Sequence, residues 1–123
     1  MSDRQAKEAL YDALAEIAKA MSSGRRAELV DVLIRGERSV EDLADEIGQS
    51  VANTSQHLQR LLRSGLVASR RDGNRIFYSV AGPSVYTLWR TLRDAAVSHV
   101  EQIDDVARAY HGKPRRAGHH HPR

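Results

Sequence analysis

The sequence predicts a mainly α-helical protein with one small β-hairpin, arranged as a winged helix-turn-helix. Three observations carry this prediction. Two short helical segments are separated only by Gly48 and Gln49, which is typical of a helix-turn-helix. Directly after them, Asp72-Gly73 lies between two β-forming runs and indicates a tight hairpin. The last helical segment then carries an apolar stripe longer than a core of this size can cover.

The composition favours a single domain. A chain of 123 residues is long enough for one modest core. The absence of cysteine excludes disulfides, thiolate metal sites and cysteine redox chemistry. No stretch approaches the ~20 apolar residues of a membrane span, and the start, MSDRQAKEAL, does not resemble a signal peptide. We therefore expect a cytoplasmic protein without a membrane partner, with a folded domain over 1–112 and a basic, histidine-rich flexible tail over 113–123.

The first two helical segments are recognised by periodicity and by glycines. In AKEALYDALAEIAKAM, apolar residues recur at steps of three and four, as on an amphipathic helix. The segment SSGRRAELVDVLIRG breaks at Gly24 and starts a second helix, which carries Leu29, Val32 and Leu33 and which Gly36 ends.

The next two helical segments form the predicted helix-turn-helix. Ser39 caps SVEDLADEIG, and Asp42 three residues later makes an approximate capping box. Ser50 caps SVANTSQHLQRL, which Gly65 ends. Its inward residues are predicted to be Val51, Thr54, Leu58, Leu61 and Leu62. Its outer face carries amides, hydroxyls and an imidazole and almost no charge, which is unusual in a chain with 28% charged residues.

The hairpin that follows is predicted to be a basic wing. Its strands are expected at Val67 to Arg71 and at Arg75 to Val80. The segment from Ser50 to Val80 contains five arginines and one aspartate. Next to an acid-free helix face, this concentration of positive charge favours a surface that contacts nucleic-acid phosphates over an ordinary solvated one.

The last helix, about Ser84 to Tyr110, predicts a homodimer. Its stripe and that of the first helix would be buried by a second copy, which would also place two recognition helices about one DNA turn apart. The candidate interface residues lie on both helices: Leu10, Leu14, Ile17, Val85, Trp89, Leu92 and Ala96.

These motifs together resemble the ArsR/SmtB family of bacterial winged-helix repressors. The similarity covers GRRAELVDVL and DLADEIGQSVANTSQHLQRLLRSGLVASRRDGNRIFYSV. The resemblance implies a transcriptional regulator that binds a double-stranded inverted-repeat operator as a homodimer. Side chains of the recognition helix would read base edges, and other groups would hold the backbone. The base-reading candidates are Asn53, Ser55, Gln56 and His57. The backbone candidates are Ser50, Arg60, Arg70, Arg71 and Arg75, with Asn74 at the wing tip.

Two of these assignments have an equally good alternative. Ser55 can instead pack inward, and His57 can form a hydrogen bond within the domain. No nucleophile and base pair, phosphate loop or paired catalytic carboxylates are present, so the sequence does not predict an enzyme.

The metal sites of the family are not matched. The cysteine pair of its third-helix site has no counterpart in SVEDLAD, and Gly82 and Ser84 replace the ligands near the start of the last helix. No cofactor is therefore required. The remaining metal candidates are His99, Glu101, His111, His119, His120 and His121. Imidazole ligands without thiolate would suit nickel first and zinc next, bound weakly.

Three hypotheses follow from the sequence. The first is an operator-binding dimer. The second is a nickel- or zinc-responsive version of this dimer, which uses the histidines of the last helix and the tail. The third is a DNA-binding subunit whose response comes from a partner protein that acts as co-regulator.

Overall fold

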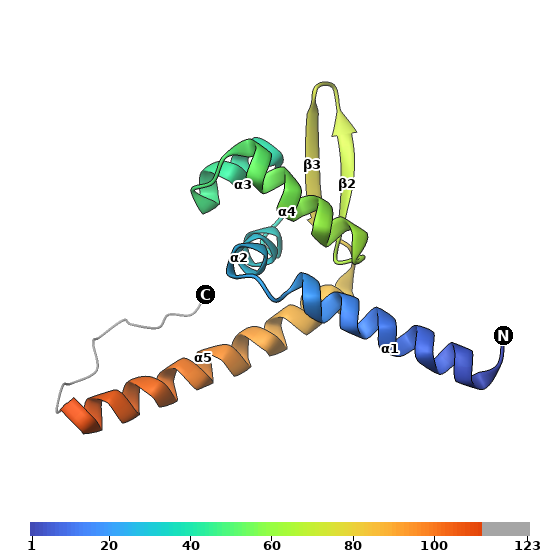
Figure 1. Ribbon diagram of the computed structural model, residues 1–123. Helices are drawn as coiled ribbons and strands as arrows, with labels where there is room; N and C mark the ends of the chain where they lie inside the picture. Colours follow the sequence, from blue (N-terminus) through green and yellow to red (C-terminus); the bar gives the residue numbers. More distant parts are fainter. Residues whose placement is uncertain (112–123) are drawn as a thin grey trace. The chain divides into compact units, whose positions relative to one another are not determined.

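The computed structural model describes residues 1–111. The order of elements is α1 (Asp3–Ala20), α2 (Gly24–Leu33), β1 (Arg38–Ser39), α3 (Val40–Ile47), α4 (Val51–Arg63), β2 (Val67–Asp72), β3 (Arg75–Val80) and α5 (Pro83–His111) (Figure 1). The chain divides into two compact units, Met1–Tyr86 and a second one that starts at Thr87. The predicted mainly helical fold with a winged helix-turn-helix is confirmed.

Serine residues start four of the helices. Ser2, Ser23, Ser39 and Ser50 each accept a hydrogen bond from the backbone N–H three residues later. Such caps satisfy N–H groups that the first helical turn leaves unpaired. For α1 the cap is a full capping box, because the Gln5 side chain also accepts from the N–H of Ser2. The first helix therefore begins at Asp3, one turn earlier than its apolar pattern indicates.

The tight turn between α3 and α4 depends on Gly48. Its φ of 67° lies in the left-handed region, which glycine adopts without strain. The N–H of Gln49 then donates to the carbonyl oxygen of Ala44 at 3.0 Å, and Ser50 caps the next helix at once. This local geometry fixes the two helices of the helix-turn-helix relative to each other.

The core of the first unit is formed by α2, α3, α4 and the sheet. Its fully buried large side chains include Leu29, Leu33, Leu43, Leu58 and Leu61. Each aliphatic side chain of this kind contributes about 1.5–3 kcal/mol on burial. The core holds α4 from one side and leaves its opposite side exposed.

Thr54 and Val51 are both predicted to point inward from α4, and the structure places them differently. Thr54 is fully buried, and among the described residues its Oγ1 has no hydrogen-bond partner. The inward prediction for Val51 is wrong, because this side chain is 48% exposed. Val51 is the first residue of α4, and side chains at a helix start point back beyond the helix end, here past the core.

The sheet has the strand order β1-β3-β2 and is antiparallel. Asp72 pairs with Arg75, so Gly73 and Asn74 are the central residues of the hairpin turn. The predicted turn at Asp72-Gly73 is thus displaced by one residue. Of these two central residues only Gly73 has a positive φ, 64°, which fits a type II′ turn with glycine at its first central position.

The β1 strand was not expected from the sequence. It consists of Arg38 and Ser39, which pair with Tyr78 and Phe77. Ser39 is therefore both the end of a strand and the cap of α3. This short strand joins the wing directly to the helix-turn-helix.

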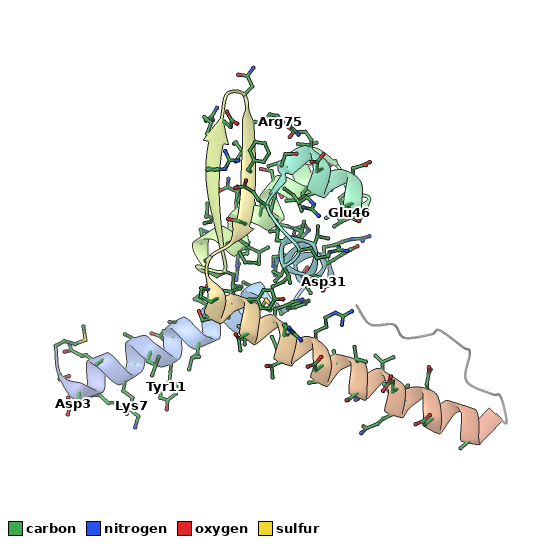
Figure 2. The ribbon with its side chains drawn as sticks, turned by 180° about the vertical axis from the view of Figure 1, so that it is seen from behind. Asp3, Lys7, Tyr11, Asp31, Glu46 and Arg75 are labelled. Carbon is green, nitrogen blue, oxygen red and sulfur yellow. The ribbon has the colours of Figure 1, made fainter. Side chains whose placement is uncertain are left out.

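Apolar side chains are exposed on α1 and, within the second unit, on α5. They include Leu10 and Leu14 on the first helix and Leu92, Val100 and Ile103 on the last. In Figure 2, Tyr11 projects from α1 in the same way. No helix among the described residues is long and apolar enough to cross a bilayer.

Candidate nucleic-acid interface

The outer face of α4 presents uncharged polar groups next to arginines. Asn53 and Gln56 are exposed, and Arg60 is half-buried. Gln59 and Arg63 share this face by helical spacing and are also exposed. Amide groups can donate and accept at once, so they can form bidentate hydrogen bonds with adenine in the major groove.

Three further predicted contacts lie at the edges of this face. The Oγ of Ser50 accepts from the N–H of Asn53 at 3.0 Å, which places the hydroxyl at the helix start. Ser55 and His57 are half-buried, between the core and the outer face. Neither side chain forms a hydrogen bond among the described residues. The within-domain hydrogen bond considered for His57 is therefore not seen there, whereas the half-buried position of Ser55 fits either of its two roles.

The wing carries arginines in two different environments. Arg70 forms an ion pair with Glu37, which lies before β1. Its Nε and Nη2 donate to the two carboxylate oxygens of Glu37, both at 2.8 Å. A second carboxylate, on Asp72, is 3.9 Å from Nη1. A bidentate pair of this kind is the strongest geometry for an arginine and a carboxylate.

The electrostatic effects of this pair agree with its geometry. The hydrogen bond from Arg70 lowers the pKa of the Glu37 carboxyl below its usual range. The same bond raises the pKa of Arg70. Both groups are therefore charged at neutral pH.

Arg75 is also held within the domain. Its Nη2 donates to the Oγ of Ser39 at 2.8 Å, and its Nε is 3.8 Å from a carboxylate oxygen of Glu41. The Oγ of Ser39 accepts from the N–H of Asp42 as well. One buried hydroxyl thus caps α3 and anchors β3, and Figure 2 shows Arg75 on the hairpin.

Two wing groups remain available to a ligand. Arg71 and Asn74 are exposed, and neither side chain forms a hydrogen bond or ion pair among the described residues. Arg71 follows Arg70 directly in the strand, so the two side chains point to opposite faces of the sheet. One face of the wing therefore carries Arg70 and Arg75, whose guanidinium groups bond within the domain. The other face carries the exposed guanidinium of Arg71.

Within the described residues, the structure does not bring the proposed metal ligands together. His99 is exposed and Glu101 is half-buried. Among the described residues, no three histidine, aspartate or glutamate side chains are grouped so that they could hold a metal ion. His111 ends α5, while His119, His120 and His121 lie outside the described residues.

The predicted interface residues of the two helices differ in exposure. Leu10 and Leu14 of α1 are exposed and Ile17 is half-buried. On α5, Leu92 and Ala96 are exposed. Val85 and Trp89 are half-buried.

The sequence pattern assigns no role to Glu37, Phe77 or Arg63. Arg63 could have been found, because it lies three residues after Arg60 on the same helical face. Glu37 and Phe77 had no such signal. Glu37 meets an arginine 33 residues away, and a single aromatic residue in a strand is more often part of a core.

Comparisons with known proteins agree with one another. Residues 23–69 match the family described as "Bacterial regulatory protein, arsR family". The chain is 38% identical over 113 residues to the HTH-type transcriptional regulator Rv0324 of Mycobacterium tuberculosis, covering 92% of this chain and 49% of that protein. It therefore spans about half the length of that relative.

Two further similarities cover most of the matched protein. The uncharacterized HTH-type transcriptional regulator Rv0081 of Mycobacterium tuberculosis is 39% identical, over 70% of this chain and 76% of that protein. The solution structure of the homodimeric winged helix-turn-helix DNA-binding domain of Mb0332 from Mycobacterium bovis superposes with a TM-score of 0.74 at 40% identity. That match covers 83% of this chain and 93% of the solved one.

Proposed function

Because the chain belongs to the arsR family of bacterial regulatory proteins, we propose that it binds an inverted-repeat DNA operator as a homodimer and thereby regulates transcription. The family consists of transcriptional regulators and not of enzymes. The observation that carries the proposal is the outer face of α4, where Asn53 and Gln56 are exposed next to arginines and no acidic side chain is present.

The chemistry of this face favours reading of bases over nonspecific attraction. Carboxylates are absent from α4, so no group on this helix repels the phosphates. Arg60 and Arg63 lie in the last turn and would contact the backbone, which fixes the register of the helix in the groove. Gln56, one turn before Arg60, would then face base edges.

A second copy of the chain accounts for the exposed apolar residues. Leu10 and Leu14 on α1, and Leu92 on α5, are 58%, 51% and 44% exposed. A symmetric pair would cover these side chains and present two α4 helices to two half-sites. The homodimeric state of the Mb0332 domain supports this proposal.

The experiment is a DNA titration at several salt concentrations with an operator selected from random duplexes. We expect the affinity to fall steeply with salt, because arginines displace counterions from phosphates. Gln56→Ala should weaken binding to the selected site by roughly 1–3 kcal/mol, the value of a bidentate base contact. It should change binding to random DNA little.

Gln49→Ala is the matched control, since Gln49 is an amide in the turn before α4. Failure to select any duplex would contradict the proposed function. An equal loss on selected and random DNA for Gln56→Ala would leave DNA binding intact but remove Gln56 as a base reader.

A further inference from the structure

Two arginines of the wing share one aromatic ring. The guanidinium carbon of Arg70 is 4.7 Å from the centre of the Phe77 ring, and that of Arg75 is 5.3 Å from it. Both distances fall within the range of a cation–π contact. Two like charges on one ring repel each other, so this arrangement requires acidic partners nearby.

The acidic partners are present and outnumber the arginines. Glu37 forms the bidentate pair with Arg70, Glu41 lies near Arg75, and Asp72 lies near Arg70. We call Arg70, Arg75, Phe77 and these carboxylates the wing anchor. It contains three acidic and two basic groups, so both guanidinium charges already have carboxylate partners within the domain.

Arg71 has the opposite properties. It pairs with Ile76 in the strand register, whereas Arg70 pairs with Phe77. Its side chain therefore lies on the other face of the hairpin. It is exposed and forms no ion pair among the described residues.

We propose that Arg70 and Arg75 are positioning residues that hold the wing against the start of α3, and that Arg71 carries the phosphate contact of the wing. The proposal rests on the DNA-binding function proposed above. It divides the wing arginines, which the sequence treats as equivalent, into one contact and two anchors. Glu37 is the decisive partner, because it lies outside the hairpin and ties it to the chain before α3.

The sign of the Glu37→Gln effect separates this proposal from its main competitor. If Arg70 contacts DNA, Glu37 competes with phosphate for its guanidinium, and removing the carboxylate strengthens binding. If Arg70 positions the wing, Glu37→Gln weakens operator binding by about two- to fivefold, the range of an exposed ion pair. Stronger binding by Glu37→Gln overturns the proposal.

A double-mutant cycle tests whether the anchor acts through Arg71. Arg71→Gln should lower the magnitude of the salt slope by about one per half-site. Arg70→Gln should then cost much less in the Arg71→Gln background than in the wild type, because a misplaced wing has no contact left to lose. Additive losses would mean that both arginines touch DNA independently, which overturns the proposal.

The charge-swapped chain Glu37→Arg with Arg70→Glu provides a rescue. It should bind the operator better than Arg70→Glu alone, because the ion pair is restored in reverse. A swapped chain that binds no better than the single variant contradicts the anchor, because the harm done by a glutamate at position 70 would then come from facing phosphate and not from the lost ion pair.

Amide hydrogen exchange without DNA keeps this inference separate from the proposed function. We expect faster exchange across Ser69 to Phe77 in Glu37→Gln and Arg70→Gln, and unchanged exchange in Arg71→Gln. Equal exchange in all three variants overturns the anchor even if DNA binds. Failure of the wild type to bind DNA contradicts the proposed function and leaves this measurement of the anchor valid.

Discussion

The guanidinium of Arg26 closes the end of α1 by donating from Nε to the carbonyl oxygen of Ala20 at 2.6 Å. Its Nη2 also donates to the carbonyl oxygen of Lys19 at 3.2 Å. The last carbonyl groups of a helix have no partner within the helix. Arg26 lies near the start of α2, so its side chain connects the end of α1 with the start of the next helix.

We expect Arg26→Met to lower the free energy of unfolding by about 1–2 kcal/mol, as for a partly exposed charged hydrogen bond. Methionine keeps an unbranched apolar stem, so the change isolates the guanidinium. Urea unfolding followed by circular dichroism measures it. Arg35→Met is the control, because Arg35 is exposed and should be neutral. Equal effects of the two changes would exclude a capping role.

We expect Thr54→Val to leave stability unchanged or to raise it by up to about 1 kcal/mol. A buried hydroxyl without a partner loses its hydration and gains no hydrogen bond in exchange, and valine has nearly the same shape as threonine. Thr54→Ala is the control and should destabilise, since it leaves a cavity. A loss of more than about 1 kcal/mol for valine would reveal a hydrogen bond to the Thr54 hydroxyl.

We expect the wing anchor to weaken in acid. The pKa of Glu37 is lowered from 4.5 by its bond with Arg70. A lowered carboxyl pKa gives stability that is complete above the unfolded value and is lost as the pH falls through the folded one. Hairpin amide exchange should therefore differ between the wild type and Glu37→Gln at neutral pH, and the difference should shrink as the pH falls from 4.5 through the lowered pKa of Glu37. A difference that persists in acid would assign it to another group.

We expect Trp89→Glu and Leu92→Glu to disrupt the proposed homodimer. A charge buried in an apolar interface costs several kcal/mol. Ser98→Glu adds the same charge at an exposed position of α5 away from this stripe and should have little effect. Light scattering at micromolar concentration provides the measurement. A monomeric wild-type protein would remove both the dimer and the two-half-site proposal.

We expect nickel or zinc to change operator affinity only slightly. Coupling requires the metal to bind one state of the protein better than another, and the described candidates do not form a cluster. DNA titrations with each metal, on the full chain and on a chain ending at Gly112, test this. A change beyond about tenfold, or about 1.4 kcal/mol, would contradict it. If the shorter chain kept that change, His99 and Glu101 would be the first residues to substitute.

The helices were predictable because their determinants are local. Apolar spacing, serine caps and glycine ends are each contained within a few residues, and they located α2, α3 and α4 closely. The β1 strand is not predicted by the sequence, because two residues are too few to show the alternation of polar and apolar side chains that marks a strand. The predicted hairpin turn lies one residue too early in the sequence. Asp72-Gly73 and Gly73-Asn74 are both favourable turn pairs, and only the pairing of the strands distinguishes them.

The outer face of α4 was predictable for the same reason, since helical spacing alone separates Gln56 from Thr54. The partners of Arg70 and Arg75 were not, because they depend on contacts across 33 and 36 residues. The sequence therefore predicts the basic wing but does not distinguish its arginines from one another. Tertiary structure divides them.

The pairing of β1 with β3 also has a consequence for the order of folding. Bringing Ser39 next to Phe77 closes a loop that contains both α3 and α4, and closure costs less entropy once those helices have formed. We expect Leu58→Ala to slow refolding and Phe77→Leu mainly to speed unfolding, as measured by stopped-flow fluorescence. Equal slowing of refolding by both changes would contradict this order. A chain caught midway would already possess its recognition helix while its wing was still unattached.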